Sequence, residues 1–284
     1  MMYILKRIFI SLFIAANVAN ISVQVPVQVH MPVVVLHGLE SSMEKIAPFC
    51  DWLTDTFNSV VFNIEIGNGE RTSMYTPMNV QLDELCETLY KIEELQYGFN
   101  FIGISQGGLL ARGYVEQCNK YKVENLITLV SPHGGEFIKN IQTNFYTDFY
   151  QNHWSIAGYW RDPTNLNAYL DKCRYLPNIN NEIFNNNSQK QIANIHKLAN
   201  FVMVWSPQDN VLSPPESGKF SFYNIQLNVI SLEDTELYKD DLLGLKFLKE
   251  KNRLHTYQTN CSHVDHRNPV CYSQLYEILK LFID

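Results

Sequence analysis

The feature that most constrains the fold of this chain is a Gly-x-Ser-x-Gly motif centred on Ser105. A short apolar run over residues 99–104 precedes it, and an apolar helical pattern follows it. In this strand–turn–helix setting the motif forms a nucleophile elbow. The turn is so sharp that a Cβ atom at position 103 or 107 would collide with the strand or the helix, so both positions are glycine. The motif therefore predicts an exposed, reactive Ser105 hydroxyl and a serine hydrolase.

Acyl transfer at such a serine needs backbone N–H groups that stabilise a developing oxyanion. The first is predicted to be the N–H of Gln106, at the start of the helix after the nucleophile. The second comes from the loop after an earlier strand. Residues 31–36 are a continuous apolar run that predicts a buried strand, and the N–H of Leu39 in the following loop is the candidate. A simple turn would explain this fragment as well, but its position in the chain favours the functional interpretation.

Apolar runs that predict strands alternate with helical patterns along most of the chain. Further strands are predicted over 60–66, 99–104, 126–130, 201–205 and 254–259, and helices over 77–96, from the motif to 118, and over 272–282. This alternation predicts an α/β fold with a mostly parallel, doubly wound central sheet and helices on both faces.

The alternation breaks between about residues 136 and 200, a stretch dense in Asn, Tyr and Trp. A disordered linker would not carry so many aromatic residues. We therefore expect an ordered insertion that lies over the sheet as a cap and shapes an apolar substrate groove. Residues 21–284 would form one domain that contains this cap insertion.

Asp209 is the candidate catalytic acid. It follows the predicted strand 201–205 and precedes the candidate base, which gives the chain order Ser, Asp, His. A turn-forming or helix-capping Asp would explain this residue as well. Asp234, Asp240 and Asp241 are alternatives, but they fall in a polar segment that we expect to be exposed.

His263 is the candidate base because it lies in the loop after the last predicted strand, from which a side chain can reach back over the nucleophile. His266 in the same loop is the alternative. These histidines and Cys261 also resemble part of a zinc site, but no complementary ligand group occurs elsewhere in the sequence. We therefore expect neither a metal nor a cofactor.

The N-terminus predicts a secretory signal peptide over residues 1–20, because Lys6 and Arg7 precede an apolar run from Ile8 to Ala16. That run is short for a bilayer span, although an uncleaved anchor would show the same pattern. No other stretch approaches transmembrane length, so we expect no stable membrane span after signal removal. The formal net charge of −7 and the lack of a basic stripe argue against nucleic-acid binding.

Six cysteines fit the oxidising compartment that a signal peptide implies. The sequence does not fix their pairing. Two pairs are geometrically reasonable: Cys86 with Cys118, on the helices before and after the nucleophile strand, and Cys261 with Cys271, around a short loop. Asn186 begins an Asn-Asn-Ser sequon and is a candidate glycosylation site.

Several longer motifs together resemble one known family, the palmitoyl-protein thioesterases, over most of the chain after the signal peptide. They include Val-Leu-His-Gly (35–38), Gly-Ile-Ser-Gln-Gly-Gly (103–108), Tyr-Trp-Arg-Asp-Pro (159–163) and Gln-Asp-Asn-Val (208–211). The combination of Ser-Gln-Gly-Gly with Tyr-Trp-x-Asp-Pro is specific, whereas neither motif would be alone.

The resemblance implies an α/β-hydrolase fold and hydrolysis of long-chain fatty acyl thioesters, as in S-palmitoylated proteins, peptides or acyl-CoA. It also implies a lysosomal or secreted protein, a catalytic set of Ser105, Asp209 and His263, and a disulfide between Cys86 and Cys118. We expect a monomer. Two alternatives remain: a secreted lipase or carboxylesterase that uses the same triad on oxygen esters, and a catalytically idle acyl-binding protein.

Overall fold

The computed structural model describes residues 30–283, so the predicted signal peptide lies outside the described residues. The longer strands are β1 (Val33–Leu36), β2 (Val61–Ile64), β3 (Phe99–Ile104), β4 (Val123–Leu129), β5 (Asn200–Trp205) and β8 (Leu254–Gln258). They form one sheet in the order β2-β1-β3-β4-β5-β8, and every neighbouring pair is parallel. A separate antiparallel pair consists of β6 (Phe222–Tyr223) and β7 (Val229–Ile230). The predicted α/β architecture is therefore confirmed.

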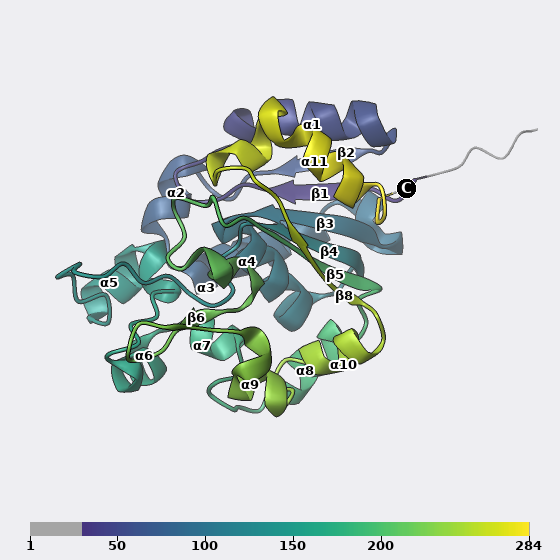
Figure 1. The fold of residues 1–284 in the computed structure, drawn as a ribbon. Coiled ribbons are helices and arrows are strands. Elements are labelled where there is room, and N and C mark those ends of the chain that lie inside the picture. The colour runs from purple at the N-terminus through teal and green to yellow at the C-terminus, as the bar shows by residue number, and fades with distance from the viewer. Residues whose placement is uncertain (1–29, 284) are drawn as a thin grey trace, which may run out of the picture.

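Helices cover both faces of this sheet (Figure 1). They are α1 (Met43–Phe57), α2 (Glu70–Tyr75), α3 (Met78–Tyr90), α4 (Gln106–Gly113), α5 (Asp148–His153), α6 (Leu166–Lys172), α7 (Leu176–Ile179), α8 (Ser188–Ile195), α9 (Glu236–Lys239), α10 (Leu245–Glu250) and α11 (Pro269–Leu279). Among the described residues, no helix is both long and apolar enough to cross a membrane.

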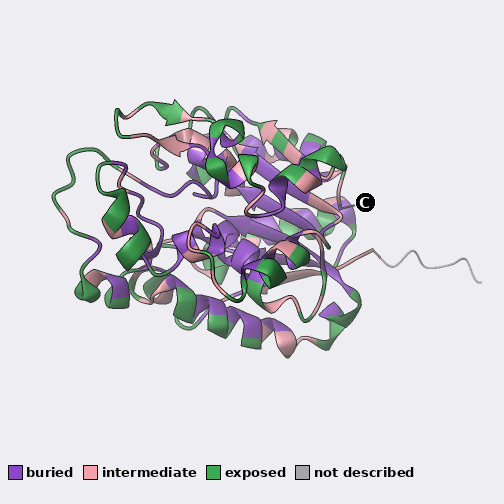
Figure 2. Cartoon of the chain, turned by 90° about the horizontal axis from the view of Figure 1, so that it is seen from below, coloured by how far each residue is buried: buried purple, intermediate pink, exposed green. Residues whose placement is uncertain are grey.

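The core has two halves because successive strand side chains point to opposite faces of the sheet. In β3, Phe101 packs into the half that contains α3 and α4, whereas Ile102 packs into the half that contains α1 and α11. The inner strands β1 and β3 are buried at every position, whereas the edge strands β2 and β8 are partly exposed. Outer helices such as α1 and α3 alternate between buried and exposed residues (Figure 2). Buried parallel strands of this kind have continuous apolar sequences, so the amino-acid sequence alone predicts their positions.

Several helix boundaries differ from the prediction. The helix expected over 77–96 ends at Tyr90. The backbone is extended at Ile92, and a separate 3₁₀ turn, Glu93–Tyr97, follows. The elbow helix does reach residue 118, but its last part, Tyr114–Cys118, is a π-helical turn. The C-terminal helix starts three residues early because Pro269 occupies the first helical turn, where proline is favourable.

The segment between β4 and β5 contains α5, α6, α7 and α8 and lies on the same side of the sheet as α3 and α4 (Figure 1). It begins with a parallel bridge between Glu136 and Trp160. Ring contacts of Phe145 and Phe137 with Trp160 continue its packing. The segment is ordered by this aromatic packing, and its interpretation as a substrate cap stays a prediction.

Candidate active site

Ser105 forms the sharp turn between β3 and α4. Its φ of 54° and ψ of −125° are strained for any residue other than glycine. A Cβ atom at Gly107 would lie 2.4 Å from the carbonyl oxygen of His37, and one at Gly103 would lie 2.4 Å from the Cα atom of Gly108. The two motif glycines are therefore required by the close approach of the backbone, as predicted.

Asp209 and His263 meet at the same edge of the sheet, in the loops after β5 and β8. His263 Nδ1 lies 2.7 Å from Asp209 Oδ2, and both residues are buried. The other carboxylate oxygen accepts hydrogen bonds from the N–H groups of Val211 and Leu212, each at 2.9 Å. Since a carboxylate oxygen only accepts, Nδ1 donates and Nε2 of the neutral ring is left as an acceptor.

Ser105 and His263 line one pocket of about 270 Å³. Its wall is mostly apolar and comes from several loops: Leu39, Pro132, Ile138, Ile156, Tyr159, Val211, Leu212 and Val264. Glu40, Glu136 and Arg267 are its remaining polar members. The structure thus brings the three residues of the predicted catalytic set together from loops that are far apart in sequence.

The two predicted oxyanion donors belong to segments that border Ser105. Gln106 is the first residue of α4, and Leu39 follows Gly38, which lies directly against the nucleophile. A Cβ atom at Gly38 would be 2.8 Å from the Cβ atom of Ser105. Neither the Leu39 nor the Gln106 backbone N–H donates to another of the residues 30–283. Both amides are therefore available to an acceptor bound at the pocket.

Glu136 is a buried carboxyl in this pocket that the sequence analysis did not identify. Its Oε1 atom accepts a hydrogen bond from the N–H of Ser213 at 3.0 Å. Burial raises the pKa of Glu136 well above its usual value; the charge of Asp209 acts in the same direction, and the bond from Ser213 acts against both. It follows Gly134-Gly135 in the loop after β4, and no sequence motif marked it as a site residue.

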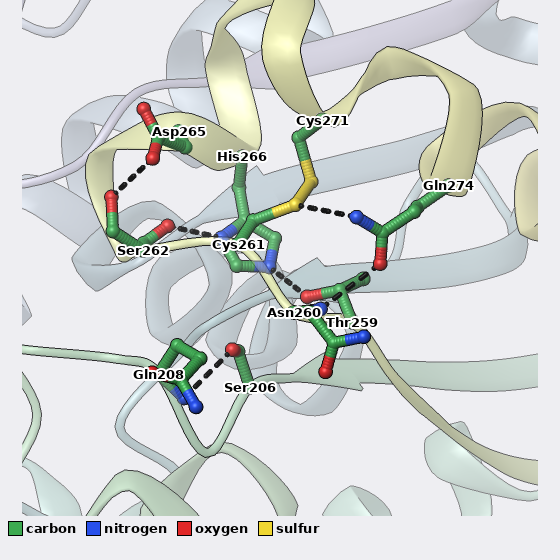
Figure 3. Close-up of a disulfide and its surroundings, with 10 residues drawn as sticks. All are labelled: Ser206, Gln208, Thr259, Asn260, Cys261, Ser262, Asp265, His266, Cys271 and Gln274. Atoms are coloured by element: carbon green, nitrogen blue, oxygen red, sulfur yellow. Dashed lines mark hydrogen bonds between the residues drawn. A yellow bond between two sulfur atoms is a disulfide. The ribbon is translucent and has the colours of Figure 1, made fainter.

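His266, the alternative base, is part of the support of the histidine loop. Its ring is buried and bridges the Thr259 hydroxyl, 2.8 Å from Nε2, and the Ser262 carbonyl, 2.9 Å from Nδ1 (Figure 3). It does not line the pocket that contains Ser105 and His263. The alternative acids Asp234, Asp240 and Asp241 do not line it either.

Both predicted cysteine pairs are disulfides in the structure. Cys86 is bonded to Cys118, which ties α3 to the end of the elbow helix. Cys261 is bonded to Cys271, which ties the loop of His263 to α11 (Figure 3). Asn186 of the sequon is exposed, as a glycan acceptor must be.

Comparison with known proteins identifies the family. The family described as palmitoyl protein thioesterase matches residues 32–263. The chain belongs to this family. Its relatives include palmitoyl-protein thioesterase 3 of Dictyostelium discoideum, 37% identical over 249 residues that cover 83% of this chain and 86% of the relative. Lysosomal thioesterase PPT2-B of Xenopus laevis is 29% identical over 250 residues, with 80% and 84% of the two chains covered.

Solved structures place the family member in the α/β-hydrolase fold. Aspergillus fumigatus lipase B superposes with a TM-score of 0.54 at 10% identity, over 88% of this chain and 52% of that chain. A monoacylglycerol lipase from Paleococcus ferrophilus gives 0.50 at 13% identity, over 89% and 93%. The resemblance and the fold expected from the sequence motifs are confirmed, and membership of the family makes the protein a hydrolase.

Proposed function

We propose that the protein hydrolyses long-chain fatty acyl thioesters with Ser105 as nucleophile, His263 as general base and Asp209 as the residue that orients the base. The hydrogen bond of 2.7 Å between Asp209 and His263, together with the pocket that His263 and Ser105 both line, carries this proposal. The relatives named palmitoyl-protein thioesterase and lysosomal thioesterase support the substrate class.

In the first half-reaction, Ser105 Oγ attacks the thioester carbonyl carbon while His263 Nε2 takes its proton. The carbonyl oxygen becomes an oxyanion, which accepts hydrogen bonds from the N–H groups of Leu39 and Gln106. When the tetrahedral intermediate collapses, the C–S bond breaks and His263 returns the proton to the sulfur. The thiol leaves, and the acyl group stays on Ser105 as an ester.

In the second half-reaction, water replaces the thiol. His263 removes a proton from water as its oxygen attacks the ester carbonyl carbon, and the same two N–H groups hold the second oxyanion. The bond to Ser105 Oγ then breaks, and His263 protonates that oxygen. The fatty acid leaves and the enzyme is restored, so one thioester and one water give one acid and one thiol.

The apolar pocket wall suits a fatty acyl chain. Burial of an acyl chain contributes roughly 0.8 kcal/mol for each CH₂ group removed from water. Leu39, Ile156 and Leu212 line the pocket beside Ser105, so a chain bound there would place its carbonyl group near the nucleophile. The leaving thiol would be the cysteine of an S-palmitoylated protein or peptide, or coenzyme A.

We also propose that the protein acts as a monomer in the secretory pathway, in lysosomes or outside the cell. Relatives named lysosomal thioesterase support this compartment. The two disulfides and the exposed sequon Asn186 agree with it. The predicted signal peptide would deliver the chain there.

The proposal is tested by the turnover of a palmitoyl thioester and of the matched palmitoyl oxygen ester by purified wild-type and Ser105→Ala protein. We expect faster hydrolysis of the thioester and a loss of about 10⁶-fold in the variant. A variant within tenfold of wild type would remove Ser105 from the mechanism. Preference for the oxygen ester would favour a carboxylesterase, and bound lipid without turnover would favour an acyl-binding protein.

A further inference from the structure

The side chain of Gln106 is fixed at both ends, although only its backbone N–H enters the proposed chemistry. Its Oε1 atom accepts a hydrogen bond from the Tyr159 hydroxyl at 3.0 Å. Its Nε2 group donates to the carbonyl oxygen of Ser73 at 2.9 Å and lies 3.4 Å from Gln81 Oε1. Gln106 is buried, so these contacts are shielded from competing water.

The orientation of residue 106 decides where its N–H points. The peptide that carries this N–H joins Gln106 to Ser105, whose φ of 54° and ψ of −125° are not a conformation that the residue adopts by itself. Strained backbone persists only where its surroundings hold it. A side chain clamped between three elements fixes the Cα–Cβ direction of Gln106 and so contributes to holding the peptide.

Tyr159 is the contact that comes from the segment after β4. The carbonyl oxygen of Tyr159 accepts the N–H of Glu136 at 2.9 Å, and its side chain lines the pocket that contains Ser105. Burial raises the pKa of the Tyr159 hydroxyl, so the group stays protonated and able to donate. The donor is therefore present at neutral pH.

We propose that Tyr159 is a positioning residue that acts through the Gln106 side chain to aim the Gln106 N–H at the oxyanion. The inference deepens the proposed function and rests on the assignment of Gln106 as an oxyanion donor. It predicts that the Tyr159 hydroxyl contributes to the transition state and not to the binding of the acyl chain.

The test is Tyr159→Phe, with Tyr175→Phe as a matched control. Tyr175 is also a buried tyrosine from the segment after β4, and its hydroxyl also donates to α4, to the carbonyl oxygen of Leu109 at 2.9 Å. Each variant loses one buried hydrogen bond to the same helix, but Tyr175 does not line the pocket. Thermal unfolding of both proteins checks that the losses of stability are comparable.

We expect Tyr159→Phe to lower kcat for a palmitoyl thioester by about tenfold to a hundredfold, because a misplaced donor loses much of its effect. KM and the Kd for palmitate should stay at the wild-type values. Tyr175→Phe should keep the wild-type kcat. Equal loss of kcat in both variants, or a loss that appears only in KM, would overturn the proposal.

A double-mutant cycle with Gln106→Met tests the route of the effect. Methionine keeps an unbranched side chain of similar length, but its thioether sulfur is only a weak acceptor in place of the amide oxygen. In this background, Tyr159→Phe should cause little further loss of kcat, because the amide oxygen that accepts the hydrogen bond is absent. If the full loss persists, Tyr159 acts by another route and the inference is wrong.

These outcomes are separate from the fate of the proposed function. If Ser105→Ala loses turnover while Tyr159→Phe keeps it, the nucleophile assignment stands and only the positioning role fails. If Ser105→Ala keeps turnover, the proposed function fails first.

Discussion

The loops that carry Asp209 and His263 are held in place by different kinds of contact. In the Asp209 loop, residues 206–214, side-chain carboxyl oxygens accept hydrogen bonds from the backbone N–H groups. Asp209 Oδ1 binds those of Val211 and Leu212, and Glu136 Oε1 binds that of Ser213. The His263 loop, residues 259–271, is closed by the disulfide between Cys261 and Cys271 and braced from inside by His266.

Because different contacts hold the two loops, different perturbations should displace them. The Asp209 loop depends on hydrogen bonds to two buried carboxyl groups, and through Glu136, whose pKa is raised by burial, it should respond to pH. The His263 loop depends on a covalent bond, so it should respond to loss of that bond. Both loops position the hydrogen bond between Asp209 and His263, and the following three comparisons of variants separate their contributions.

The largest effect is expected for Asp209→Asn. Asparagine Oδ1 can still accept the two backbone N–H groups of the loop, but its amide N–H₂ would face His263 Nδ1 and favour the wrong tautomer. We expect kcat to fall by about 10⁴-fold with little change in the melting temperature. Steady-state kinetics and calorimetry measure the two quantities.

Asp265→Asn is the control for this change. Asp265 lies two residues from His263 and accepts a hydrogen bond from the Ser262 hydroxyl at 2.6 Å, whereas the hydrogen bond of the His263 ring is made with Asp209. Its kcat should stay within about twofold of wild type. A loss of activity as large as that of Asp209→Asn would mean that removal of any nearby negative charge suffices.

The next largest effect is expected when the two disulfides are removed one at a time. The Cys86–Cys118 bond closes a loop of sequence separation 32, and the Cys261–Cys271 bond one of 10. Replacing a pair by serines should cost about 3–4 kcal/mol of unfolding free energy for the longer loop and about 2–3 kcal/mol for the shorter.

Activity should follow the opposite order. Loss of the Cys261–Cys271 bond loosens the His263 loop and should lower kcat by about tenfold at a temperature where the protein is folded. Loss of the Cys86–Cys118 bond should leave kcat unchanged there. Chemical denaturation and kinetics measure the two orders, and parallel losses of stability and kcat would show that the shorter bond has no special link to His263.

The smallest effect is expected for Glu136→Gln and concerns pH. Because its pKa is raised, folded Glu136 keeps its proton above pH 4.5, whereas the unfolded chain releases it. The free energy of unfolding of the wild type therefore falls as pH rises from 4.5 toward the folded pKa. Glutamine does not titrate, so the variant should lose less stability over this range.

Denaturant unfolding between pH 4.5 and 7 measures this difference. Burial also raises the pKa of Glu116, to about 7, but this residue is present in both proteins and cancels in the comparison. Equal slopes of stability against pH in wild type and variant would show that Glu136 is ionised in the folded protein.

The sheet and the three central site residues were predictable for local reasons. Strands such as β1 and β3 are buried on both faces, and nearly all of their residues are therefore apolar. The Ser105 turn demands glycines that stand out in the sequence. Asp209 and His263 follow from chain order once the strands are known, since the ends of parallel strands meet at one edge.

The sequence does not show how the rest of the site is assembled. Tyr159 belongs to the Tyr-Trp-Arg-Asp-Pro motif, but it and Glu136 reach the pocket only because the segment after β4 folds back, and no periodicity reports such a contact. Arg112 and Glu116 show the same limit: an i, i+4 charge pair usually indicates an exposed helix face. Here both side chains are fully buried, because the segment after β4 covers them. Arg112 also donates a hydrogen bond to Asn180 of that segment.

The central claim is that Ser105 is the acylated nucleophile. Labelling of the folded wild-type protein with a fluorophosphonate probe, followed by mass-spectrometric mapping, tests it most directly. We predict one adduct on the peptide that contains Ser105, no labelling of Ser105→Ala, and slower labelling of Asp209→Asn. An adduct on another serine, or an unlabelled protein that still hydrolyses palmitoyl thioesters, would contradict the account.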